Sequence, residues 1–402
     1  MTNESELPEF LAIDFYCGAG GTTRGLLDAG GYVICGIDKD ESNRVTYQSN
    51  NRNTTLDQDK PMFLALDMFP RSTGYPGGQQ QEVRAELRKL IPRYRSMGSG
   101  VPLLFVICAP CQSFTRFVQR KMTAARTESR IRDLDLLSQT LGFIEEFQPE
   151  LIVSENVASI KTGKYRHVWS NFQDDLCDLG YVVGEDQVCA SRFGVPQNRR
   201  RSVLLAIRNE AGSDLGSSLT VPTDDPDARS VSAREAIDHL PALDAGGESH
   251  DVSNHVCRNL VEVNRQRLMS VKPGEPNSGF SDTKFGDISL PCHNRLAAKG
   301  AKGFGDVYTR MHPDRPAPTL TTRFLNISNG RFGHYDESQV RGLSLREGAA
   351  LQSFSDDYLF YGEGLDSIAR MIGNAVPPKL AAYMAKWLLG LWQNRRLSVS
   401  GR

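Results

Sequence analysis

The chain has 402 residues and a mass of 44.5 kDa, of which 39% are hydrophobic and 24% charged. This length predicts at least two domains, and the composition excludes disordered and fibrous proteins. The longest apolar run, 103–109, has seven residues, whereas a bilayer span needs about 20, so we expect no membrane segment. The first nine residues hold three Glu and no Lys or Arg, which argues against a secretory leader and for a cytoplasmic protein.

The net charge of −1 hides an uneven distribution along the chain. Residues 4–67 carry a net charge of −6, residues 84–132 carry +9 and residues 252–323 carry +5. Two separate basic stretches are compatible with a polyanionic partner that approaches from one side. Basic side chains that only solvate helix faces would give the same counts, and charge alone favours this second interpretation.

The first half of the chain alternates short apolar runs with amphipathic stretches of helix length. Strands are predicted at 11–16, 33–37, 63–66, 103–108, 151–153 and 203–207. Helices are predicted between them, at 22–29, 40–50, 82–91, 133–147 and 168–179. This alternation predicts an α/β fold with a doubly wound, mostly parallel sheet, whose ligands gather at the carboxyl ends of the strands.

The alternation stops at residue 209. From there to about residue 290, Gly, Ser, Asp and Pro accumulate and no strand–helix rhythm remains. Helices are predicted again at 345–354 and 377–392. The sequence therefore predicts a second, smaller and irregular domain.

A glycine-rich segment, 14–21, follows the first predicted strand and opens the first predicted helix. Its glycines let the backbone approach a ligand, and the helix N-terminus offers unpaired N–H groups. Asp38, at the end of the second strand, could bind ribose hydroxyls, and Asp67, after the third, could accept from an adenine amino group. A dinucleotide fingerprint needs a third glycine where Thr23 stands, so S-adenosylmethionine is favoured over NAD. A tight turn without a ligand is the remaining alternative.

Two strand ends deliver chemically useful side chains to the same predicted edge of the sheet. Cys111 follows the strand at 103–108 in Ala109-Pro110-Cys111-Gln112, and Glu155 follows the strand at 151–153. A nucleophile and an acid at one edge form a candidate catalytic pair. Cys108 and Cys111 also have the spacing of a redox pair, but Cys108 is expected to be the last buried residue of its strand.

A third polar run leads into the strand at 203–207. Alternation places Gln197, Arg199 and Arg201 on one face of this run and Asn198 and Arg200 on the other. The eight cysteines do not form the paired spacings of a zinc site, so no metal is expected. Most cysteines are expected to be reduced and buried.

Taken together, these motifs resemble the DNA cytosine-5 methyltransferase family of the bacterial modification type. The resemblance covers roughly residues 11–208 and 305–392. It rests on the loop at 14–21, on Pro110-Cys111-Gln112, on Glu155-Asn156-Val157 and on Gln197-x-Arg199-x-Arg201. Downstream it includes Arg341-x-Leu343 through Glu347 to 351–354, and Gly373-Asn374-Ala375-Val376-Pro377.

Three positions depart from the family pattern. Tyr16 replaces the usual Phe, which keeps a ring for stacking on adenine and adds a hydroxyl. Asp38 stands where Glu is frequent and has a shorter reach to the ribose. Cys108-Ala109 replaces the more usual Gly-Pro or Gly-Phe.

The resemblance implies an enzyme that transfers a methyl group from S-adenosylmethionine to C5 of a cytosine flipped out of duplex DNA, through a covalent bond between Cys111 and C6. The implied catalytic residues are Cys111, Glu155, Arg199 and Arg201. The implied cofactor-binding residues are Asp14, Tyr16, Gly18, Gly20, Gly21, Asp38, Asp67, Pro110 and Asn374. The implied substrate-binding residues are Gln112, Asn156, Gln197, Arg116, Arg126 and Arg130.

The resemblance also implies a domain plan and partners. A catalytic, cofactor-binding domain is predicted at 8–208, a target-recognition domain at 209–365 and a return to the catalytic domain at 366–395. The expected partners are double-stranded DNA and a cognate restriction endonuclease, with the protein a monomer on the bacterial nucleoid in the cytoplasm. The rivals are a tRNA cytosine-5 methyltransferase, an NAD-dependent oxidoreductase with a redox cysteine pair, and a catalytically silent DNA-binding relative.

Overall fold

The structure is a computed structural model that describes residues 7–56, 59–96, 100–110, 132–162, 165–209, 219–297 and 305–400. The chain divides into two compact units. The first is built from Met1–Phe193, Arg200–Asp227 and Val376–Arg402, and the second from Gly194–Arg199 and Ala228–Ala375. The predicted recognition domain, 209–365, overlaps the second unit but has other ends, and its role stays a prediction.

The first unit contains a seven-stranded sheet with the order β3-β2-β1-β4-β5-β8-β6. Its strands are β1 (Leu11–Phe15), β2 (Tyr32–Ile37), β3 (Met62–Leu64), β4 (Leu103–Ile107), β5 (Leu151–Val157), β6 (Tyr181–Cys189) and β8 (Arg200–Arg208). Strands β1 to β5 pair in parallel, and β8 lies antiparallel between β5 and β6. Every residue of β1, β2 and β4 is buried, because helices cover both faces, and this is why these strands read as continuous apolar runs.

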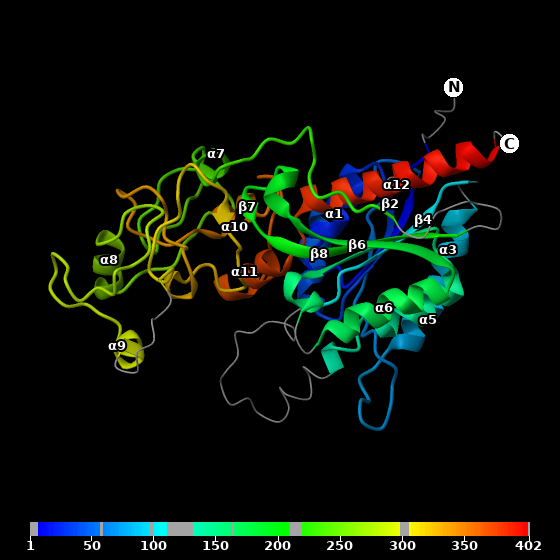
Figure 1. The fold of residues 1–402 in the computed structure, drawn as a ribbon, viewed down its shortest axis with the longest axis horizontal. Helices are drawn as coiled ribbons and strands as arrows, with labels where there is room; N and C mark the ends of the chain where they lie inside the picture. Colours follow the sequence, from blue (N-terminus) through cyan, green and yellow to red (C-terminus); the bar gives the residue numbers. More distant parts are fainter. Residues whose placement is uncertain are drawn as a thin grey trace. The chain divides into compact units, whose positions relative to one another are not determined.

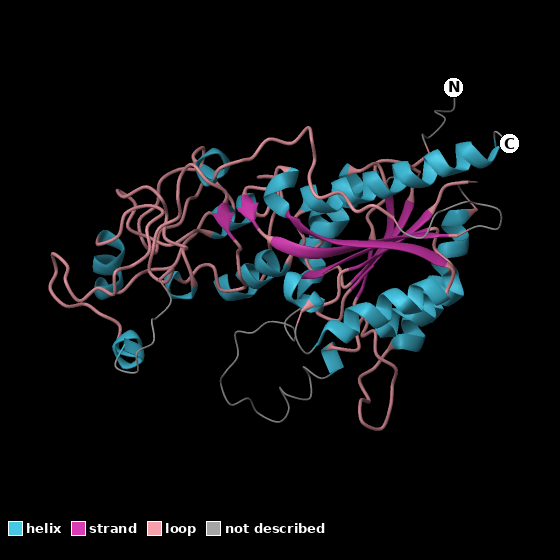
Figure 2. Ribbon diagram, viewed as in Figure 1, coloured by secondary structure: helices cyan, strands magenta, loops and turns pink. Residues whose placement is uncertain are grey.

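Helices lie on both faces of the sheet, as Figures 1 and 2 show. They are α1 (Gly21–Asp28), α2 (Arg44–Asn50), α3 (Gln80–Arg95), α5 (Ser138–Phe147), α6 (Arg166–Asp178) and α12 (Pro378–Ser400). Apolar side chains of α3, α5 and α6 join Leu11, Ile13 and Phe15 of β1 in one core. Helices α1 and α12 pack against each other so closely at Gly25 that a Cβ there would lie 2.4 Å from the Pro378 carbonyl oxygen. Within the described ranges, no helix combines the length and apolar character of a membrane span.

The predicted doubly wound, mostly parallel α/β fold is confirmed, with corrections at one edge. Strand β6 was not predicted, because Gly184, Glu185 and Asp186 interrupt its apolar pattern, as suits an edge strand. Strand β5 was predicted to end at residue 153 but continues to Val157. Glu155 and Asn156 therefore lie within a strand rather than after one.

The second unit is mostly loops with short regular elements. These are β7 (Gln197–Asn198), paired in parallel with β9 (Ala317–Pro318), and the helices α7 (Ala233–Ile237), α8 (Glu262–Met269), α9 (Pro291–Ala297), α10 (Leu345–Leu351) and α11 (Leu365–Asn374). Buried arginines connect the loops. Arg341 donates to both carboxylate oxygens of Glu347, at 2.8 and 2.6 Å, and Glu347 also closes the capping box of α10 with Ser344. Side chains supply here the hydrogen bonds that a sheet would otherwise supply.

Candidate active site

The glycine-rich loop crosses from β1 to α1 with an unusual backbone. Tyr16, Gly18 and Gly20 all have positive φ angles, of 62°, 52° and 92°. A Cβ on Gly18 would meet no atom of the described residues within 4 Å, so the space beside this backbone is open. The Gly18 N–H donates to Asp38 Oδ2 at 3.0 Å, which joins the loop to the end of β2. The loop thus has the close-approach surface that the sequence predicts.

Asp14 lies fully buried beneath this loop. Its Oδ2 accepts from the Thr23 hydroxyl at 2.6 Å, whereas its Oδ1 has no hydrogen-bond partner among the described residues. Burial raises the pKa of Asp14 from 3.8 to about 7, against the hydrogen bonds from Thr23, and the charge of Asp38 raises it further. A buried carboxylate oxygen that accepts no hydrogen bond from the described residues is suited to a cationic ligand. Sequence reasoning treated Thr23 only as a missing glycine and did not find this role.

Tyr16, Asp38 and Asp67 lie together at the carboxyl ends of β1, β2 and β3. Burial raises the pKa of Tyr16 well above its usual value, and the nearby charges of Asp67 and Asp38 raise it further. Asp67 Oδ1 accepts from the Phe69 N–H at 2.9 Å, and Oδ2 accepts from the Tyr75 hydroxyl at 2.6 Å. Three carboxylates and an open glycine backbone fit the cationic, nucleoside-containing S-adenosylmethionine.

Glu155 and Arg201 form a buried ion pair at the junction of β5 and β8. Arg201 Nε lies 2.7 Å from Glu155 Oε1, and the two side chains are only 9% and 12% exposed. The N–H does not point at this oxygen, so the contact is charge attraction rather than a directed hydrogen bond. Antiparallel pairing opposes Arg201 to Val157, two residues from Glu155, and so delivers the cation to the acid.

Asn156 joins β5 to the segment that precedes Cys111. Its side chain is fully buried and donates from Nδ2 to the Ala109 carbonyl at 3.2 Å, while its Oδ1 accepts from the Val157 N–H. Pro110, the next residue after Ala109, is exposed. The contact of Asn156 with a substrate stays a prediction, since in this structure both of its polar atoms bond to the chain.

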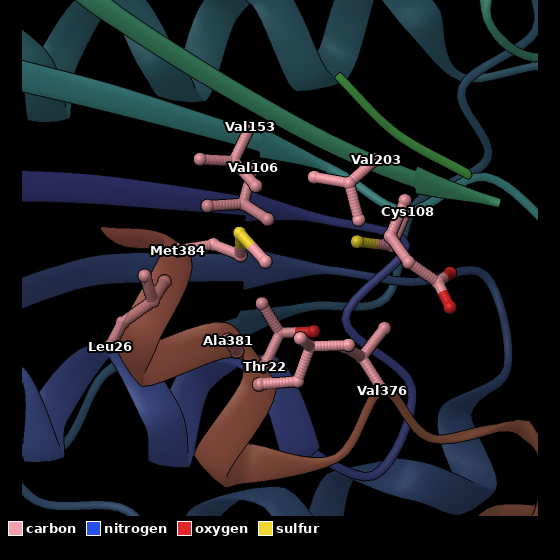
Figure 3. Close-up of a pocket in the computed structure, with 11 residues that line it drawn as sticks. Thr22, Leu26, Val106, Cys108, Val153, Val203, Val376, Ala381 and Met384 are labelled. Carbon is pink, nitrogen blue, oxygen red and sulfur yellow. The ribbon is translucent and has the colours of Figure 1, made fainter. Parts of the chain in front are cut away.

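A pocket lies between the sheet and helices α1 and α12 (Figure 3). Apolar side chains such as Leu26, Val106 and Met384 line most of it, and Cys108 and Glu155 also line it. Figure 3 shows the Cys108 sulfur pointing into this space. Cys108 is thus partly exposed, not fully buried as predicted, because β4 ends one residue earlier, at Ile107.

Burial raises the pKa of the Cys108 thiol well above its usual value, and the charge of Glu155 raises it further. Both effects disfavour the thiolate form of Cys108. The seven cysteines within the described residues are all unbridged, but only Cys17, Cys35 and Cys257 are buried, fewer than predicted.

Gln197 and Arg199 belong to the second unit. The predicted alternation is confirmed, since residues 197, 199 and 201 are buried and residues 198 and 200 are exposed. Gln197 bonds to the Leu351 carbonyl, to Gln352 and to the Leu320 N–H. Arg199 is 3% exposed and donates to the carbonyl groups of Leu320, Gly373 and Ala375. Both side chains therefore hold segments of the second unit together, and their contacts with DNA stay predictions.

The remaining predicted residues divide into two groups. Asn374 is exposed at the end of α11, in the second unit, and its contact with the cofactor stays a prediction. Cys111, Gln112, Arg116, Arg126 and Arg130 lie at positions 111–131, outside the described residues.

Comparison with known proteins decides the family. The protein family described as "C-5 cytosine-specific DNA methylase" matches residues 98–389 of this chain. The chain belongs to this family. It is a DNA (cytosine-5-)-methyltransferase that uses S-adenosylmethionine as methyl donor.

Its relatives match it along nearly the full length. It is 31% identical over 395 residues to the Type II methylase M.HgiDII of Herpetosiphon aurantiacus, covering 96% of this chain and 98% of the relative. It is 27% identical over 420 residues to the Type II methyltransferase M.DdeI of Desulfomicrobium norvegicum, covering 96% and 90%.

Solved structures support the fold. A prophage-encoded protein of E. coli, named as a DNA modification methyltransferase, has a TM-score of 0.65 at 18% identity and covers 96% of this chain and 99% of its own. DNMT2 of Spodoptera frugiperda has a TM-score of 0.56 at 16% identity, covering 94% and 99%. At these identities the likeness concerns the fold alone.

Proposed function

We propose that this protein methylates a cytosine flipped out of a specific duplex sequence, through a covalent bond between Cys111 Sγ and C6 of the base. The observation that carries the proposal is the buried Glu155–Arg201 ion pair beside the Asn156 contact to Ala109. Ala109 precedes Cys111 by two positions, so the acid lies next to the segment that leads into the nucleophile. An acid beside the segment that leads into a nucleophile suits nucleophilic activation of a heterocyclic base.

The proposed chemistry begins with the Cys111 thiolate, which forms a bond to C6 while the C5–C6 double-bond electrons move toward C5. With a proton on one oxygen, Glu155 would donate to N3 while its other oxygen accepts from the exocyclic amine, which stabilises the charge that reaches the ring. Bound S-adenosylmethionine would supply an activated methyl group to C5, its sulfur–methyl bond breaking as the new bond forms and S-adenosylhomocysteine being the leaving group. A base then removes the C5 proton, the electrons of that C–H bond restore the double bond, and the sulfur leaves C6 as thiolate.

Arg201 has two tasks in this proposal. Its charge holds Glu155 in place from β8, and its guanidinium is the candidate for binding O2 of the base. We assign Arg199 a positioning task, in addition to the predicted contact with a phosphate, because its guanidinium bonds to three backbone carbonyl groups. Flipping the base costs a few kcal/mol of stacking, which contacts of Gln112, Arg116, Arg126 and Arg130 with the DNA would offset.

The cofactor would bind at the carboxyl ends of β1, β2 and β3. Asp14 would face its cationic part, because Oδ1 is a buried acceptor with no partner among the described residues. Asp38 would bind the ribose, Asp67 the adenine amino group, and Tyr16 the adenine ring, while Gly18, Gly20 and Gly21 leave room for close approach. Pro110 and Asn374 complete the proposed set.

The second unit would read the DNA sequence, since its loops can carry side chains to base edges without a regular pattern. Relatives named as Type II methylases support a cognate restriction endonuclease as a partner. We propose a monomer that works on the nucleoid in the bacterial cytoplasm.

The test compares Cys111→Ser with Cys108→Ser. With labelled S-adenosylmethionine and duplex DNA, Cys111→Ser should lose methyl transfer and the SDS-stable adduct with 5-fluorocytosine DNA, and Cys108→Ser should keep both. A folded but inactive Cys108→Ser variant would contradict the single-nucleophile mechanism. Methylation of tRNA in place of duplex DNA would contradict the substrate.

The role of the second unit has its own test. A hybrid in which residues 210–305 come from a relative of different specificity should form the Cys111 adduct but methylate the relative's site, as read by bisulfite sequencing. A well-folded hybrid that methylates the original site would place sequence readout elsewhere in the chain.

A further inference from the structure

Tyr75 is held firmly in the loop that joins β3 to α3. Its backbone and that of Ser72 exchange two hydrogen bonds, of 3.1 and 3.0 Å, and its ring meets the Phe69 ring edge-on at 5.7 Å. The Arg132 guanidinium lies over the Tyr75 ring, 4.6 Å from its centroid. Burial and the hydrogen bond to Asp67 raise the pKa of Tyr75 to about 12, so the hydroxyl keeps its proton and acts as a donor.

The Tyr75 hydroxyl donates a hydrogen bond to Asp67. The Tyr75 hydroxyl lies 2.6 Å from Oδ2, while Oδ1 accepts from the Phe69 N–H at 2.9 Å. One donor on each oxygen fixes the rotation of the carboxylate, and each oxygen keeps a second lone pair for another donor. Without Tyr75, the group on the Oδ2 side would be Lys39, 4.0 Å away and largely exposed, which could draw the carboxylate out of its orientation.

We propose that Tyr75 is a positioning residue of the cofactor site, which orients the Asp67 carboxylate to receive the 6-amino group of adenine. The proposal rests on the proposed assignment of Asp67 to adenine. Its consequence is selectivity for the base, since a cofactor with hypoxanthine in place of adenine has no amino group to donate. Nothing in the sequence marks Tyr75 for this role, because it stands alone in a Gly- and Pro-rich turn.

The test measures dissociation constants by calorimetry for S-adenosylhomocysteine and S-inosylhomocysteine. The wild type should prefer the adenosyl compound. Tyr75→Phe removes the hydroxyl but keeps the ring and its contacts with Phe69 and Arg132. It should reduce the preference for the adenosyl compound about fivefold, because only the adenosyl compound should bind more weakly. This factor is the effect of one hydrogen bond of about 1 kcal/mol. In an Asp67→Ala background the same substitution should change nothing.

The control is Tyr94→Phe, which removes a hydroxyl bonded to Asp59 Oδ2 at 3.4 Å, outside the proposed pocket. It should leave the preference unchanged, and melting temperatures check that each variant is folded. The proposed role of Tyr75 is overturned, and the Asp67 assignment is not, if Tyr75→Phe keeps the wild-type preference or binds the adenosyl compound more tightly. A wild type that binds the adenosyl compound without preference overturns the Asp67 assignment as well, and a wild type that binds neither overturns the proposed cofactor site.

Discussion

Replacing Asp14 by Asn should make the protein more stable and weaken its cofactor binding. Asp14 is fully buried, and its pKa of about 7 lies above the ordinary value of 3.8 that it has in the unfolded chain. A carboxyl group whose pKa is raised on folding contributes stability that is complete below pH 3.8 and is lost as the pH rises through 7. Above that pH, the folded protein holds a charge that the unfolded chain would solvate.

The size of the effect follows from the two pKa values. Ionised Asp14 lowers the free energy of unfolding by about 4 kcal/mol at pH 8. An Asn side chain avoids this cost and can still accept from the Thr23 hydroxyl, but it buries an unpaired amide N–H that costs about 1–3 kcal/mol. We therefore expect Asp14→Asn to be about 1–3 kcal/mol more stable than the wild type at pH 8. Between pH 6 and pH 8, this difference should grow by about 1 kcal/mol.

Urea unfolding without cofactor, followed by circular dichroism, measures these differences. The matched control is Asp28→Asn, which changes an exposed carboxylate paired with Arg24 and should alter stability by less than about 0.5 kcal/mol. Titration calorimetry should show weaker binding of S-adenosylmethionine to Asp14→Asn, because the acceptor for its cationic part is neutral. The reasoning is refuted if Asp14→Asn is no more stable at pH 8 and the difference does not depend on pH.

Three further outcomes are expected. Arg201→Gln leaves Glu155 buried without its cation and should lower the free energy of unfolding by about 3–5 kcal/mol in urea titrations; the double variant with Glu155→Gln should recover much of this, and an unchanged stability would contradict the pair. Replacing Arg116, Arg126 and Arg130 by Ala should make the plot of log binding constant for DNA against log salt concentration less steep, by about 0.9 for each phosphate that the variant no longer neutralises. Cofactor affinity should not change. A slope equal to that of the wild type would mean that these residues only solvate the protein. Gly25→Ala should cost about 1–3 kcal/mol, because its Cβ would meet Pro378 and Ala381, whereas Gly390→Ala in α12, where a Cβ meets no described atom within 4 Å, should be neutral or stabilising in the same unfolding assay.

The order of strands β1 to β5 and of the helices between them could be predicted from the sequence, because both kinds of element carry local periodicities. Strands buried on both faces, such as β1 and β4, appear as unbroken apolar runs. The glycine loop was also predictable, since Gly18 and Gly20 adopt positive φ angles that glycine accepts without strain. Tyr16, with a φ of 62°, shares this conformation, and no sequence signal predicted it. Its hydroxyl, the departure from the family pattern, donates to the Leu136 carbonyl at 2.7 Å, 120 positions along the chain.

Arg199 and Arg201 show where the sequence stops being sufficient. Alternation correctly placed both on one face, which the structure shows to be buried. It could not distinguish the two arginines, because a period of two gives the face on which a side chain lies but not the groups that it meets. The tertiary structure gives Arg201 the carboxylate of Glu155 and gives Arg199 carbonyl groups 121 to 176 positions away. A guanidinium bonds to whichever acceptors the fold brings within about 3 Å. The sequence by itself determined which side chains share a face, and only the folded chain decided that this face is buried and which partner each charge meets.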